Sequence, residues 1–294
     1  MSTDHDKPIG PWAPRAHEPG SQAAGVFRKI TPAELAAWVL FEDERVIVIN
    51  KDGHFPCHPS KDGPWSSLSG AVRAHFGDSA AHLVLRLDRE TSGVVLYARD
   101  TATARRLQMA AERRLYSKTY LAILCGELRA PVNVDEPLGS DYETPITIKN
   151  RVVPRGSARA QEARTRFEPL AAKNGFTLAR VTTGTGRKHQ IRVHAQWLGH
   201  SLVGDKIYGP DARLYLEFIE TGWTPKLAER LLLPRQALHC AEIDLRASGV
   251  DYIFRAPLAQ DMEKFCNERM GLAGAGAGVI NIEQRVDLNR PKST

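Results

Sequence analysis

The stretch RLDRETSGVVLYA, residues 86–98, combines an acidic turn with a strongly apolar run. Another apolar run, residues 82–87, leads into it, and residues 94–98 follow the turn at 91–93. Short apolar runs bounded by turn residues are typical of buried strands. The pattern therefore predicts two strands joined through the segment that carries Asp88.

A carboxylate at the junction of a strand and a turn is well placed to point into a cleft. Arg86 and Arg89 lie close to Asp88 in the chain, and positive charges favour the ionised form of a carboxyl group. An ionised, well-positioned carboxylate can serve as a nucleophile or a base. A capped turn with an ion pair at the surface accounts for the same pattern, and the pattern alone favours that simpler interpretation.

The rest of the chain predicts an α+β fold. Thr31-Pro32-Ala33-Glu34 has the signature of a capped helix start, because Thr31 can cap and Pro32 suits the first turn. Several predicted strands follow one another without a helix between them, which disfavours a strictly alternating β-α-β fold. We therefore expect a mixed, mostly antiparallel sheet core flanked by helices. The further expected elements are strands at 46–50, 116–124 and 176–181, a helix from a Thr101 cap to about 114, and a helix at 192–198.

The composition is that of a globular protein with a basic surface. The chain has 294 residues, of which 42% are hydrophobic and 25% charged, and its formal net charge is +6. This balance suits a polyanionic partner without proving one. The four cysteines form no Cys-x-x-Cys pair, which disfavours a zinc ribbon. With no secretory signal and no apolar run of about 20 residues, we expect a soluble, cytoplasmic protein with no membrane partner.

The two ends of the sequence differ from its middle. Residues 1–25 are rich in Pro, Gly and polar residues and are expected to form a flexible N-terminal arm. Residues 271–294 are expected to form a C-terminal tail, in which 279–288 could pair as a strand. No linker divides the part between them, so residues 26–270 are predicted to be one domain.

Lys118 and Tyr120 lie on the strand predicted at 116–124 and would share one face of it with Ala122. A tyrosine that faces a cleft can stack on an unstacked base. A core tyrosine with its hydroxyl group hydrogen-bonded explains the pattern equally well, and without further context that interpretation is favoured.

A glycine-rich turn at 183–186 leads into a basic segment that is predicted to be helical. Backbone N–H groups at a helix N-terminus, together with Arg187, Lys188 and Arg192, suit phosphate contacts. Arg192 could instead form a two-pronged pair with a buried carboxylate, and a solvated basic helix face is the simplest explanation. His189, His194 and His200 suggest a metal site, but their spacing fits no zinc motif, and a metal site is therefore disfavoured.

The segment 199–209 reads as a loop, a short strand and a turn. Asp205 is predicted to cap that turn, and no independent chemical role is assigned to it. Residues 210–235 resemble an insertion that either helps to hold a ligand or packs as a helical hairpin.

The order of these segments resembles the RluA family of pseudouridine synthases. The resemblance rests on VIVINKDGHFPCHP from residue 46, RLDRETSGVVLYA from 86, KTYLAILCG from 118, TGRKHQIRVHAQWLGHSLVGDKIYG from 185 and ALHCAEIDL from 237. It runs from about residue 41 to about 245. Leu85 stands where many members have His, and Asp52 where Pro is frequent, but neither position touches the chemistry that the resemblance implies. The small N-terminal S4 domain of many relatives is not expected here.

The resemblance implies an RNA pseudouridine synthase with residues 26–270 as its catalytic domain. It assigns Asp88 as the essential aspartate, Tyr120 as the ring against the target base, and Arg192 as the partner of the aspartate. Uridine isomerisation involves no redox change and no group donor, so neither a cofactor nor a metal is expected. The expected partner is RNA, with ribosomal RNA slightly favoured over transfer RNA, and the expected state is a monomer. The residues predicted to bind the substrate are Arg86, Arg89, Lys118, Arg187, Lys188, His189 and Gln190.

Two other functions fit parts of the sequence. The same fold could serve as an RNA-binding module, although binding alone would not require Asp88, because a carboxylate facing phosphates weakens RNA binding. A hydrolase or metal enzyme that uses the histidines is the third possibility.

Overall fold

The computed structural model describes residues 28–58, 63–78 and 81–272. The expected N-terminal arm and the expected tail strand lie outside these ranges. The helices are α1 (Pro32–Trp38), α2 (Leu68–Phe76), α3 (Thr101–Glu112), α4 (Gln190–Trp197), α5 (Arg213–Thr221), α6 (Pro225–Leu231) and α7 (Gln260–Glu268). The strands are β1 (Val39–Glu42), β2 (Val46–Lys51), β3 (His82–Leu85), β4 (Ser92–Ala98), β5 (Ser117–Cys125), β6 (Val132–Asp135), β7 (Leu138–Ser140), β8 (Asn150–Val152), β9 (Arg164–Lys173), β10 (Phe176–Thr183), β11 (Leu238–Asp244) and β12 (Ile253–Arg255).

One large sheet organises the described part of the chain. Its strand order is β1-β2-β4-β11-β5-β10-β9-β6, with β3 paired to β4 and β12 paired to β11. All these pairings are antiparallel except that of β11 with β4. This arrangement confirms the predicted α+β fold with a mixed, mostly antiparallel sheet.

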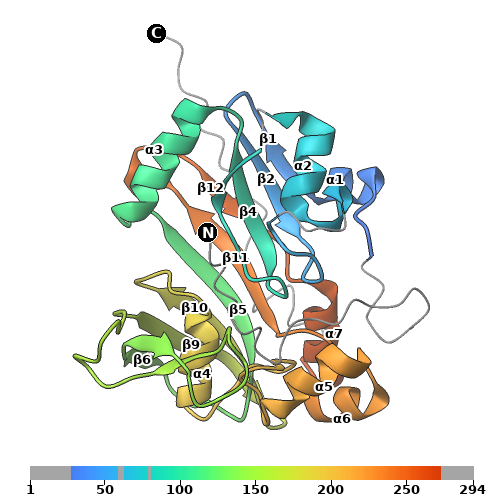
Figure 1. Cartoon of the computed structure of the whole chain (residues 1–294), viewed down its shortest axis with the longest axis vertical. Coiled ribbons are helices and arrows are strands. Elements are labelled where there is room, and N and C mark those ends of the chain that lie inside the picture. Colours follow the sequence, from blue (N-terminus) through green and yellow to red (C-terminus); the bar gives the residue numbers. More distant parts are fainter. Residues whose placement is uncertain (1–27, 59–62, 79–80, 273–294) are drawn as a thin grey trace, which may run out of the picture.

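The long middle strands β5 and β11 connect two halves of the molecule (Figure 1). One half, with α1, α2 and α3, buries the apolar residues of β2 and β4 in a single cluster. In the other half, α4 packs against β9, and separate clusters lie on the two sides of β5. Tyr120, near the middle of β5, packs against the clusters of both halves. The sequence therefore brings a predicted site residue to the boundary between the halves.

The N-terminal cap of α1 is the one predicted from the sequence, whereas that of α3 is not. At α1 both hydrogen bonds of a capping box between Thr31 and Glu34 are present, as predicted. At α3 the cap is Asp100, not Thr101, because the carboxylate of Asp100 accepts a hydrogen bond from the Thr103 N–H at 2.8 Å. Thr101 is the first helical residue instead.

The segment 210–235 forms a helical hairpin from α5 and α6. Leu214 of α5 packs with Leu227 and Leu231 of α6 in a small apolar cluster. Within the described ranges, no helix is both long enough and apolar enough to cross a membrane.

Gly93, at the start of β4, sets how closely this strand approaches β11. Its φ is +107°, and a Cβ placed on it would lie 2.2 Å from the carbonyl oxygen of Cys240. Cys240 and Gly93 are partners in the parallel pairing of the two strands. The glycine in the sequence RLDRETSG is therefore required by backbone conformation and by strand packing together.

Gly93→Ala should lower the free energy of unfolding by about 2–4 kcal/mol, because it adds backbone strain and a steric clash. Urea unfolding measures this loss. Gly77→Ala is the matched control, since Gly77 has a φ of +92° but nothing within 4 Å of the position that a Cβ would take. Equal losses in the two variants would show that the close approach of β4 to β11 contributes nothing.

Candidate active site

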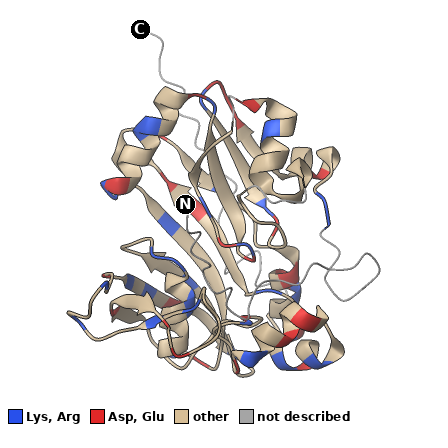
Figure 2. Ribbon diagram, in the orientation of Figure 1, with Lys and Arg blue, Asp and Glu red and all other residues tan. Residues whose placement is uncertain are grey.

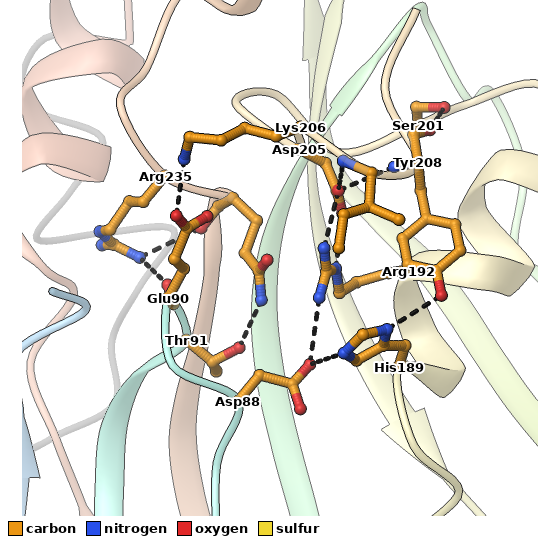
Figure 3. Close-up of polar contacts among 12 residues, drawn as sticks. Asp88, Glu90, Thr91, His189, Arg192, Ser201, Asp205, Lys206, Tyr208 and Arg235 are labelled. Atoms are coloured by element: carbon orange, nitrogen blue, oxygen red, sulfur yellow. Dashed lines mark hydrogen bonds and ion pairs between the residues drawn. The ribbon is translucent and has the colours of Figure 1, made fainter. Parts of the chain in front are cut away.

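Asp88 lies in the turn between β3 and β4. The Thr91 N–H donates to the Asp88 carbonyl oxygen at 3.1 Å and closes this turn. The Asp88 side chain is 31% exposed, whereas its two neighbours in Figure 3, His189 and Arg192, are 8% and 6% exposed. The carboxylate is therefore more accessible to solvent than the two polar groups beside it.

The backbone of this turn is held by side chains from distant parts of the chain. The buried Lys51 Nζ donates to the Arg89 carbonyl oxygen at 2.9 Å, and Arg235 Nη1 donates to that of Glu90 at 3.1 Å. Lys206 Nζ pairs with the Glu90 carboxylate at 2.6 Å (Figure 3). Burial lowers the pKa of Lys51 to about 8, and the charge of Arg235 acts in the same direction. Sequence analysis did not identify these contacts.

Arg192, on α4, makes its closest ion pair with Asp205 rather than with Asp88. Its Nε and Nη2 atoms donate to the two Asp205 oxygens at 2.7 and 2.8 Å, while Nη1 lies 3.5 Å from Asp88 Oδ2. The guanidinium also lies 4.9 Å from the centre of the Tyr208 ring. Of the alternatives that the sequence left open for Arg192, the two-pronged pair with a buried carboxylate is the one observed.

Asp205 has a second role beyond the turn cap that was predicted for it. It accepts hydrogen bonds from the N–H groups of Ile207 and Tyr208 at 3.0 and 2.9 Å, which confirms the cap. Burial alone would raise its pKa, but the charge and hydrogen bonds of Arg192 outweigh burial and hold this pKa below its usual value. Asp205 therefore stays ionised and orients Arg192 toward Asp88.

His189 is brought to Asp88 from the start of α4. Its Nε2 lies 3.9 Å from Asp88 Oδ2, and its Nδ1 lies 2.9 Å from the Tyr208 hydroxyl oxygen (Figure 3). Burial lowers the pKa of His189 to about 4, and the charge of Arg192 adds to this effect. The ring is therefore neutral at pH 7.

Tyr120 and Lys118 lie on β5, two residues apart, and both are within electrostatic reach of Asp88. Burial raises the pKa of Tyr120 well above its usual value, and the negative charges of Cys240 and Asp88 would act in the same direction. Burial lowers the pKa of Lys118, whose Nζ lies 5.7 Å from the centre of the Tyr116 ring. The structure thus brings the predicted carboxylate, aromatic and guanidinium groups to one region.

The other predicted site residues are distributed around this region. Arg86 is exposed, and its Nη1 lies 3.3 Å from His58 Nε2. Lys188 is exposed, whereas Arg187 is partly buried and its Nε donates to the Glu162 carbonyl oxygen. The Gln190 side chain is buried and bonded within the protein, to Arg164, Thr165, Thr185 and Arg187.

The three histidines considered for a metal are engaged separately. His194 contacts Thr165 and the Glu136 carbonyl oxygen, and His200 contacts the Cys125 carbonyl oxygen, whereas His189 faces Asp88. In the part of the chain that the structure describes, no group of three or more His, Cys, Asp or Glu side chains is arranged to hold a metal ion.

Comparison with known proteins identifies the family. A family model described as RNA pseudouridylate synthase matches residues 45–197. The chain belongs to the RNA pseudouridine synthase family. This synthase is 32% identical over 237 residues to YhcT of Bacillus subtilis, which is named an uncharacterized RNA pseudouridine synthase. The aligned region covers 78% of this synthase and 70% of YhcT. It is also 34% identical over 231 residues to the ribosomal large subunit pseudouridine synthase D of Vibrio parahaemolyticus. That aligned region covers 76% of this synthase and 68% of the Vibrio protein.

Solved structures agree with this result at the level of the fold. The human protein named RNA pseudouridylate synthase domain containing 4 matches with a TM-score of 0.62 and 24% identity, over 80% of this synthase and 94% of that chain. A second human protein, named RNA pseudouridylate synthase domain containing 1, matches with a TM-score of 0.57 and 21% identity. This match covers 82% of this synthase and 86% of that chain. The resemblance to RluA-type enzymes that the sequence motifs indicated is confirmed.

Asp205→Asn should lower the free energy of unfolding of the synthase by about 3 kcal/mol, because it leaves the buried Arg192 without its counter-charge. Since the pKa of Asp205 is lowered by folding, the advantage of the wild type should be complete above pH ~4 and shrink as the pH falls further. Urea unfolding at several pH values measures both effects.

Asp211→Asn provides the control for this experiment. Asp211 also pairs with an arginine, at 2.8 Å, but that Arg213 side chain is 86% exposed. Its replacement should leave the unfolding free energy nearly unchanged. If Asp205→Asn lowered the unfolding free energy as little as Asp211→Asn does, the buried pair of Arg192 and Asp205 would not stabilise the fold.

Proposed function

We propose that this synthase converts specific uridines in structured RNA to pseudouridine, with Asp88 as the catalytic carboxylate and no cofactor. The observation that supports it most directly is the placement of Asp88, partly exposed and 3.5 Å from the buried Arg192. Arg192 carries a fixed positive charge, because the pairing with Asp205 keeps its pKa high in spite of burial. That charge lies where it can orient the Asp88 carboxylate.

The chemistry needs few groups. The bond between N1 and C1′ of uridine breaks, the uracil rotates, C5 bonds to C1′, and the proton that leaves C5 is matched by one gained at N1. Asp88 can attack C1′, add to C6, or remove a proton from C2′, and all three roles need an ionised carboxylate. Tyr120 would hold the detached uracil by stacking. Because burial raises its pKa, its hydroxyl group stays protonated and can donate a hydrogen bond.

The substrate binds by leaving its stack. A target uridine inside a helix cannot reach Asp88, so the nucleotide must be turned outward, as for other enzymes that act on bases. Arg89, beside Asp88, would fill the vacated space or contact a phosphate, and Lys118 would line the pocket. Ribosomal RNA is favoured as the substrate, in keeping with the name of the Vibrio relative.

Basic residues next to the pocket fit phosphate contacts. Figure 2 shows Lys and Arg on β9 and in the segment that leads into α4. Among them, Arg164, Arg166 and Lys188 are exposed, and Arg187 lies beside them. Gln190 connects the two segments, since its amide donates to the Arg164 carbonyl oxygen at 2.8 Å. We propose that Gln190 supports this basic surface from within, while Arg86, Arg187 and Lys188 contact RNA.

Asp88→Asn should reduce pseudouridine formation on the order of 10³-fold or more while leaving RNA binding intact, because it removes the reacting carboxylate and keeps its shape. Pseudouridine mapping of total RNA measures this activity. The cells lack the chromosomal gene and are supplied with either the wild-type protein or Asp88→Asn. Sites that only the wild type restores would identify reaction and substrate together. If no site depends on the gene and the protein still binds RNA, the RNA-binding module becomes the better explanation.

Lys188→Gln should weaken RNA binding and reduce the slope of log K against log salt by about 1, because one phosphate contact is lost. The turnover of bound RNA should change little. Lys264→Gln on α7 is the control, since Lys264 is also exposed, at 70%, and pairs only weakly with Glu268. A fall in turnover with unchanged binding would refute the assignment of Lys188.

A further inference from the structure

His189 occupies an unusual backbone position at the start of α4. Its φ of +59° lies in the left-handed region, which side chains other than glycine adopt at a cost. This conformation places the ring between Tyr208 and Asp88 (Figure 3). The side chain of His189, which was predicted to bind the substrate, is only 8% exposed.

The neighbours of His189 determine which ring nitrogen carries the proton. The Asn150 N–H donates to the Tyr208 hydroxyl oxygen at 2.9 Å, and His189 Nδ1 lies at the same distance from that oxygen. A phenol has one proton to donate, and a buried hydroxyl group normally uses it. Tyr208 therefore donates to Nδ1, which leaves the proton of the neutral ring on Nε2, the atom that faces Asp88.

A neutral ring fits this position better than a charged one. Beside it lie the cations Arg192 and Lys188 and the carboxylates Asp88 and Asp205. Burial and Arg192 together lower the pKa of His189 to about 4, against the two carboxylates. The ring can thus offer an N–H group to Asp88 without placing a second positive charge against Arg192.

Both contacts of Asp88 with α4 involve the same oxygen atom. Arg192 Nη1 and His189 Nε2 lie 3.5 and 3.9 Å from Oδ2. A separation of 3.9 Å is longer than a hydrogen bond, and we expect it to shorten when the target nucleotide fills the pocket.

We propose that His189 is a positioning residue that holds Oδ2 of Asp88 through its Nε2–H and so presents Oδ1 to the substrate. This proposal rests on the assignment of Asp88 as the catalytic carboxylate.

Two substitutions separate this role from a structural one. The amide nitrogen of His189→Gln reaches the position of Nε2, whereas that of His189→Asn reaches only the position of Nδ1. Asn adopts the left-handed conformation more readily than most residues, so a purely structural role makes Asn the milder change. The positioning role reverses this order, because only Gln keeps a donor toward Asp88.

The measurement is kcat and KM on ribosomal RNA purified from cells that lack the gene. His189→Asn should lower kcat by roughly 10- to 100-fold, the usual effect of losing a group that orients or stabilises a reacting one. His189→Gln should retain at least about fivefold more kcat than Asn, and KM should change little in either. Equal kcat values for Asn and Gln, or a rise in KM alone, would overturn the proposal.

A second measurement does not depend on activity. Nitrogen NMR of the labelled protein reports the protonation of each imidazole nitrogen of His189. We expect Nε2 protonated and Nδ1 unprotonated throughout pH 6–8; a protonated Nδ1 overturns the proposal. If the wild type and Asp88→Asn both lack activity while the NMR result holds, the proposed function fails and the tautomer assignment stands.

Discussion

The buried ion pair between Arg192 and Asp205 is the interaction on which the site depends. Removing two such groups from water is costly, and the cost is offset only where the geometry is good and the remaining hydrogen-bonding atoms are used. Here both Asp205 oxygens accept from the guanidinium, and one also accepts two backbone N–H groups. The pair joins α4 to the turn after it and leaves one Arg192 nitrogen for Asp88. Its main effect is therefore to fix the position of Arg192 relative to Asp88.

The turn that carries Asp88 is fixed through its backbone rather than through the Asp88 side chain. Lys51 and Arg235 donate to successive carbonyl oxygens, those of Arg89 and Glu90. Lys206 holds the Glu90 side chain, and its Nζ lies 4.5 Å from the centre of the Phe218 ring on α5. The α5–α6 hairpin therefore contacts the lysine that supports the turn carrying Asp88. The Asp88 side chain itself makes the longer contacts, 3.5 Å to Arg192 and 3.9 Å to His189.

Sequence patterns predicted structural features that depend on residues close together in the chain. They missed the contacts between residues that are far apart in the chain. Apolar runs predicted β2, β5 and β10, and the order of motifs predicted the family. A two-pronged pair with a buried carboxylate was one of the alternatives for Arg192, and it is the one observed. Its partner Asp205 was predicted only as a turn cap, because the residues next to it in the chain indicate nothing more. Lys51 shows the same limit: no pattern indicates a lysine that is 1% exposed and bonded to three carbonyl oxygens.

The charges of the group around Asp88 differ in sign from those of the surface beside it. Arg192 faces two carboxylates, Asp88 and Asp205, and His189 is neutral, so this group of four side chains carries a formal net negative charge. It therefore contributes no attraction for a polyanion. The positive charge must come from exposed residues such as Lys188 and Arg164, outside the pocket. In the proposed scheme, binding and chemistry belong to different residues of adjoining segments, and α4, which begins next to the exposed Lys188 and carries Arg192, connects them.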